Sequence, residues 1–152
     1  MAILRWIFAL AVGGFLIAFG AMKFAGAHIF QYIEFKATGL GLPMADLFYP
    51  VVNYATGGLE LAAGILTILP MTRSFGSKLA VLPFAGAVGF HLSPLLGVVT
   101  PDGFTPSASL DQALASGGPF LAEHFAGGSY FLFTLAAVML GVAVINALFI
   151  QK

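Results

Sequence analysis

Four apolar stretches, each about as long as a bilayer is thick, constrain the fold of this 152-residue chain more than any other feature. They cover approximately residues 4–26, 47–70, 78–97 and 127–150. A helix needs roughly 20 apolar residues to cross the hydrocarbon core, whereas a strand of a membrane barrel alternates apolar and polar residues over about 10. Continuous apolarity therefore predicts an all-α membrane protein, a bundle of four transmembrane helices.

The composition supports this class and excludes several functions. Hydrophobic residues make up 60% of the chain and charged residues only 8%, against about 25% charged in a soluble domain. The formal net charge is zero and no basic run occurs, so a nucleic-acid partner is not expected. Without cysteine, thiolate catalysis and Fe–S ligation are excluded. We expect one membrane domain over residues 1–152, in contact with the lipid bilayer.

Two connections are predicted to contain short helices. Within residues 28–41 the apolar side chains recur on one helical face, which favours a helix lying in the membrane interface and ending at Gly39. The long connection over residues 98–126 holds a capping pattern at Ser109 and a stop signal at Gly117. A long ordered loop can be a lid, a docking surface for a partner or a solvated cover, and these alternatives stay open.

The distribution of basic residues predicts the orientation of the bundle. Arg5, Arg73, Lys78 and Lys152 fall on one side of an even-numbered bundle, while Lys36 falls on the other. Because Lys and Arg are enriched in cytoplasmic loops, both termini are expected in the cytoplasm.

Three polar residues lie inside the apolar stretches and form the best candidate site. Glu60 lies near the middle of the second stretch, Lys23 towards the end of the first, and His91 in the third. At about 1.5 Å per residue, Glu60 is roughly 15 Å above Pro70 and His91 roughly 20 Å above Lys78, so the two are nearly level. Intramembrane ionisable residues usually face a protein interior with a partner, which predicts a ligand or proton site.

Helical spacing adds Asn53 to this candidate site. Asn53, Gly57, Glu60 and Gly64 share one face of the second stretch, and Gly13, Gly20 and Lys23 share a face of the first. Small residues let helix backbones approach closely, so the two faces are expected to meet around the polar site. No spacing of histidines and acids predicts a metal site.

Each polar residue also has a purely structural interpretation. Lys23 would extend its ammonium group to the outer headgroups, and Glu60 would orient helices. His91 would hydrogen-bond a carbonyl freed by Pro94 or a nearby helix. The sequence does not choose between these interpretations and a functional site.

Several motifs together resemble the DoxX-like family of small four-helix membrane proteins. They are ELAAGIL at 60–66, PMTRSFG at 70–76, Ala87 followed by His91-Leu92, and GAMKF at 20–24 after an arginine at the start of the first stretch. The resemblance covers most of residues 4–97 and, more loosely, the last helix. The segment 98–126 is longer than is expected for the family.

The resemblance implies a role as an accessory, quinone-interacting subunit of a redox complex in the bacterial cytoplasmic (inner) membrane. A bound quinone or lipid is then the expected ligand, with Tyr54, Phe84 and Phe90 lining its ring and Glu60 and His91 supplying a proton route. We expect a partner subunit or a homo-oligomer, and an accessory role rather than an autonomous enzyme. A structural or assembly subunit and a small proton-coupled transporter remain as alternatives.

Overall fold

The computed structural model describes residues 2–26, 29–100 and 128–151, and every regular element in these ranges is a helix. The nearest approach to a strand in these ranges is a single antiparallel bridge between Thr100 and Ser129. The all-α class is therefore confirmed for the described part of the chain. The predicted helix near Ser109 lies outside the described residues.

Three helical segments are long and apolar enough to cross a membrane, which marks the chain as a membrane protein. They coincide with the first, second and fourth apolar stretches. They are α1 (Ala2–Phe24); the run Ala45–Ile68, made of η1 (Ala45–Leu47), η2 (Phe48–Val52) and α3 (Asn53–Ile68); and the run Phe131–Ile150, made of α7 (Phe131–Ile145) and η4 (Asn146–Ile150).

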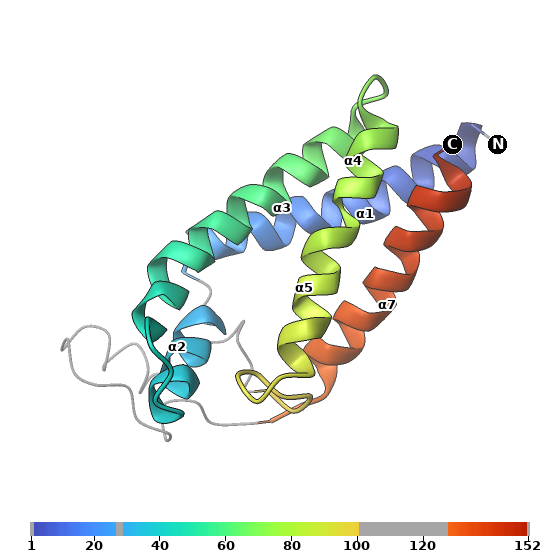
Figure 1. Ribbon diagram of the computed structural model, residues 1–152. Coiled ribbons are helices and arrows are strands. Elements are labelled where there is room, and N and C mark those ends of the chain that lie inside the picture. The colour runs from blue at the N-terminus through green and yellow to red at the C-terminus, as the bar shows by residue number, and fades with distance from the viewer. Residues whose placement is uncertain (1, 27–28, 101–127, 152) are drawn as a thin grey trace.

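The third apolar stretch is not one continuous helix over residues 78–97, and that prediction is wrong. It forms α4 (Arg73–Leu79) and α5 (Val81–His91), which follow one another with a break at Ala80 (Figure 1). Pro83 has no N–H to donate to the carbonyl of Leu79, so the hydrogen-bond ladder is interrupted where α4 ends.

The long helices form two pairs. α1 and α3 lie side by side over most of their length, and α5 lies beside α7, while α4 joins the two pairs at one end (Figure 1). The core between the pairs consists of buried apolar side chains, mostly small: Val12, Leu16, Ala63, Ala80, Phe84 and Ala143.

Glycines allow the close approach of α1 and α3. A Cβ atom on Gly64 would lie 2.7 Å from the carbonyl oxygen of Gly13, and one on Gly20 would lie 2.8 Å from that of Gly57. Neither distance is compatible with a side chain, so backbone contacts backbone at both levels. The prediction that the small-residue faces of the two helices meet is confirmed.

Buried amides hold the C-terminal segment against the rest of the bundle. The Gln151 side chain donates to the backbone carbonyl of Arg5 (2.8 Å) and to Oδ1 of Asn146 (2.9 Å). The Asn146 amide donates in turn to the Ser77 hydroxyl (3.0 Å). These bonds link η4 to α1 and α4, which places both ends of the described chain at the same end of the bundle.

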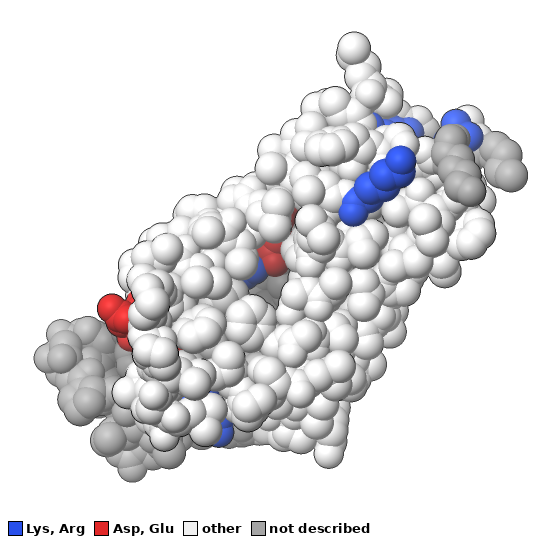
Figure 2. Space-filling view, in the orientation of Figure 1, with Lys and Arg blue, Asp and Glu red and all other residues white. Residues whose placement is uncertain are grey.

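Basic side chains gather at this same end (Figure 2). The Arg73 guanidinium lies 3.9 Å from the centre of the Trp6 ring, which stands next to Arg5 on α1. The predicted grouping of Arg5 and Arg73 on one side is therefore confirmed, while Lys152 lies outside the described residues.

At the opposite end, α2 (Ile29–Gly39) forms the short helix predicted between the first two stretches. Its buried Phe30 and Ile33 pack with Leu96 in a second apolar cluster that also contains Phe48 and Phe90. This cluster closes the end of the space between the two helix pairs, directly beside the predicted polar site.

Candidate functional site

A cavity of about 240 Å³ lies between the two helix pairs, and the three predicted polar residues all line it. Apart from Lys23, Glu60, His91 and Thr56, the described residues that line its wall are apolar. α1, α3, α5 and α7 form the sides, and α2 with Leu96 contributes at the end. Figure 2 shows a hollow between α3 and α5 in which acidic and basic atoms are visible.

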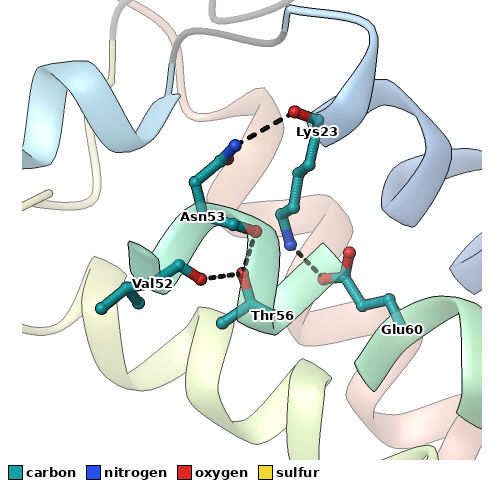
Figure 3. A network of polar contacts seen from close by, with 5 residues as sticks. All are labelled: Lys23, Val52, Asn53, Thr56 and Glu60. Atoms are coloured by element: carbon teal, nitrogen blue, oxygen red, sulfur yellow. Dashed lines mark hydrogen bonds and ion pairs between the residues drawn. The ribbon is translucent and has the colours of Figure 1, made fainter. Parts of the chain in front are cut away.

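An ion pair joins the two charged residues of the wall. Lys23 Nζ donates to Glu60 Oε1 at 2.5 Å, and each side chain is only 11% exposed. Lys23 lies near the end of α1 and Glu60 lies in the middle of α3, so the pair links the two closely packed helices (Figure 3). The Lys23 ammonium also lies 5.4 Å from the centre of the Phe30 ring on α2. A cation over an aromatic face is attracted by the ring quadrupole.

Asn53 fixes the backbone beside this ion pair. Its Nδ2 donates to the backbone carbonyl of Lys23 at 3.0 Å (Figure 3). That carbonyl lies in the last turn of α1, where it has no partner within the helix. Asn53 therefore holds the end of α1 against the start of α3 and so positions Lys23, although it does not itself line the cavity.

Thr56 uses its hydroxyl within its own helix. Oγ1 donates towards the carbonyls of Val52 (2.8 Å) and Asn53 (3.0 Å), one turn earlier (Figure 3). The hydroxyl proton can satisfy one of these carbonyls at a time, and the oxygen keeps its lone pairs as acceptors. Thr56 is thus a weak polar group on the cavity wall and not a charge partner for Glu60.

The second carboxylate oxygen of Glu60 is buried and has no hydrogen-bond partner among the residues that the structure describes. An unpaired buried acceptor is unusual, because the desolvation cost of such a group is about 1–3 kcal/mol, and more when it is charged. Because Glu60 lines the cavity, this unused acceptor lies at the cavity wall. This oxygen is the sharpest chemical feature of the site.

His91 presents the third polar group of the wall. Its Nδ1 lies 2.9 Å from the backbone carbonyl of Gly97, which can only accept, so Nδ1 carries the proton and Nε2 is left as the acceptor of a neutral ring. The ring also contacts Phe133 edge to face at 5.7 Å. A bond from His91 to a backbone carbonyl agrees with the structural interpretation, although the carbonyl is that of Gly97 and not one freed by Pro94. The position of His91 on the cavity wall is compatible with a functional role.

Comparisons with family models, with curated proteins and with solved structures give no match for this chain. The chemistry of the cavity therefore follows from its own residues.

Of the three aromatic residues predicted to line the ring of a ligand, two lie on the cavity wall and one does not. Phe84 and Phe90 belong to the cavity wall. Tyr54 does not line the cavity, because it points away from the cavity side of α3. Its side chain is 41% exposed and stacks on Phe24, with ring centres 5.3 Å apart. Tyr54 and Glu60 differ by six positions, which puts them on different faces of the helix.

Four further aromatic and aliphatic residues of the wall are not predicted from the sequence. Phe15 and Phe19 of α1 stack with ring centres 4.1 Å apart and line the cavity, and Phe30 and Ile33 reach it from α2. The spacing of four residues between the two phenylalanines could have indicated a shared face with Lys23. Nothing in the sequence indicates that α2 folds back towards the cavity.

The polar groups of the cavity can form hydrogen bonds with a bound molecule and can donate protons to it or accept protons from it. The site offers an ammonium group, an unpaired carboxylate oxygen and an imidazole nitrogen in an apolar enclosure, where hydrogen bonds and charges act more strongly than in water. In the part of the chain that the structure describes, no three His, Cys, Asp or Glu side chains come together as metal ligands.

Proposed function

We propose that this chain is an accessory subunit of a redox complex in the bacterial cytoplasmic membrane, and that its cavity holds the ring of a quinone-like ligand. The observation that carries the proposal is the unpaired Glu60 Oε2 in an otherwise apolar cavity that also contains Lys23 and His91. A quinone ring needs apolar walls, together with a donor and an acceptor for its oxygens. Phe84 and Phe90 supply apolar surface, and the resemblance to the DoxX-like family supports the same ligand class.

The size of the cavity supports this class of ligand. A volume of about 240 Å³ is below the roughly 300–1,000 Å³ of sites for drug-sized molecules, so it accommodates a ring but not a long tail. A membrane quinone is a ring with such a tail. In this proposal the charged groups of the cavity contact the quinone ring. The electrons come from the partner subunit, because this chain contains no cysteine to ligate an iron–sulfur cluster.

The proposal includes four membrane spans with both termini in the cytoplasm. α4 and α5 together cover residues 73–91, which is 19 residues or about 28 Å of helix, close to the thickness of the hydrocarbon core. Arg5 and Arg73 at the end that holds both termini favour the cytoplasmic side for that end.

A structural role is the second candidate, because the Lys23–Glu60 pair joins α1 to α3. The glycine contacts already bring these two helices together over their length. A pair that served only to join them would not need an unpaired carboxylate oxygen in a cavity. This difference favours ligand binding.

The test is direct binding of a short-tailed benzoquinone or naphthoquinone, and of the corresponding quinols, to the purified protein in lipid nanodiscs. Glu60→Gln keeps an oxygen for Lys23 but replaces the free acceptor with an amide NH2 group, which only donates. Affinity for the quinol should fall roughly tenfold or more, the value of one hydrogen bond to a buried charge.

Glu34→Gln is the matched control, because it makes the same change on α2 outside the cavity wall. It should leave the affinity unchanged. Absence of binding to the wild-type protein, or equal affinity in the wild type and Glu60→Gln, would refute the proposed ligand site and leave the structural role.

A further inference from the structure

We propose that the cavity opens sideways into the bilayer between α3 and α5, and that the apolar tail of the ligand lies in this opening across Gly86. This inference rests on the proposed function and adds the route and the part of the ligand that remains in lipid.

The opening is flanked by residues of both helices that belong to the cavity wall. Leu82 and Gly86 of α5 are exposed, and Thr56 and Leu59 of α3 are half-buried. A residue that both lines a cavity and is exposed marks its rim. The hollow in Figure 2 lies at this place, with α3 on one side and α5 on the other.

The surroundings of the opening are those of a lipid-facing surface. Glu60 is the only charged residue of α3, and α5 contains no Asp, Glu, Lys or Arg. Large apolar side chains are exposed on both helices, with Ile65 49% and Leu82 59% exposed. Because this part of α3 lies inside a candidate membrane span, the mouth faces hydrocarbon and not water.

Gly86 keeps the opening clear. A Cβ atom built on Gly86 meets no other atom within 4 Å, so the space beside it is open. Gly89, one turn further along α5, is also exposed and has equally free surroundings, but it does not line the cavity. The two glycines are therefore a matched pair, one on the rim and one beyond it.

The volume and the unpaired oxygen decide which molecule fits the opening. A ring that reaches Glu60 Oε2 fills much of a cavity of about 240 Å³, so a tail attached to it must leave through the mouth. An amphiphile of this kind is already dissolved in the bilayer. The opening therefore suits a tailed ring and gives no advantage to a water-soluble ligand.

The experiment compares a short-tailed quinone with the same ring lacking its tail, bound to the protein in nanodiscs. Gly86→Trp fills the opening and should weaken binding of the tailed molecule by roughly tenfold or more, as overfilled contacts do. The ring without its tail should lose much less. Gly89→Trp places the same side chain on the same helix and should change neither affinity.

Leu82→Trp provides a second variant on the rim in case Gly86→Trp lowers the melting temperature of the protein. The inference is overturned if both rim variants bind the tailed quinone as the wild type does, or if they weaken both ligands equally. In either case binding of the tail-less ring to the wild type would leave the proposed function intact. If neither molecule binds the wild-type protein, the proposed function fails and this inference fails with it.

Discussion

Replacing the two members of the buried ion pair, singly and together, tests whether the pair is truly shielded from water. Lys23 and Glu60 are 11% exposed and lie 2.5 Å apart. With an effective dielectric constant of about 20, the attraction over that distance is about 7 kcal/mol, most of which offsets the cost of removing both charges from water. Lys23→Met or Glu60→Leu alone should lower the free energy of unfolding by about 3–5 kcal/mol, because each leaves a buried charge unpaired.

The double variant Lys23→Met/Glu60→Leu should recover most of that loss, since two apolar side chains of similar size leave no charge behind. Unfolding in mixed micelles with increasing dodecyl sulfate, followed by circular dichroism, gives the free energies for a double-mutant cycle. Lys36→Met on α2 serves as the control and should change stability by less than about 0.5 kcal/mol. Water reaches the pair if each single variant lowers the free energy of unfolding by less than about 1 kcal/mol. The same conclusion follows if the double variant is as unstable as the less stable single variant.

Two further predictions concern a close helix contact and an acidic side chain on α2. Gly64→Ala should destabilise the protein by about 1–3 kcal/mol, because its Cβ would lie 2.7 Å from a backbone oxygen of α1. The control is Gly14→Ala, whose Cβ would meet nothing within 4 Å and which should be neutral or stabilising in the same unfolding assay. Equal effects of the two substitutions would contradict the close contact. Partial burial, and then the nearby carboxylate of Asp46, raise the pKa of Glu34 above its ordinary value of 4.5. The folded state then binds this proton more tightly than the unfolded state, so stability should fall as pH rises from about 4.5 through the raised pKa, and the slope should be smaller in Glu34→Gln; identical slopes of melting temperature against pH would refute this.

The sequence predicts the long helices well, because continuous apolarity over about 20 residues is typical of a helix that crosses a bilayer. It does not predict the break between α4 and α5. Pro83 lies in an apolar run that still satisfies a count of hydrophobic residues, although it removes a hydrogen bond to Leu79. Hydropathy measures transfer into lipid and is insensitive to a single missing backbone bond.

The site is predicted in part for a similar reason. Depth along the helices places Glu60 and His91 at nearly the same level, and helical spacing puts Lys23 and Glu60 on the faces where their two helices meet. The structure places all three on one cavity wall. The cavity itself could not be predicted, since an empty volume depends on which rotamers fill the space between helices. The different positions of Tyr54 and Phe84 illustrate this, because both are aromatic residues near the polar level and only Phe84 contacts the cavity.

The pairing of α1 with α3 has a consequence for how the protein is made. Both helices belong to the first 68 residues, so the ribosome completes them before α5 and α7 are synthesised. Lys23 and Glu60 can then leave the translocon as an ion pair with no net charge, so the nascent chain does not expose an unpaired carboxylate to lipid. The cavity is assembled only afterwards, when the second helix pair arrives and encloses a charge pair that is already in place.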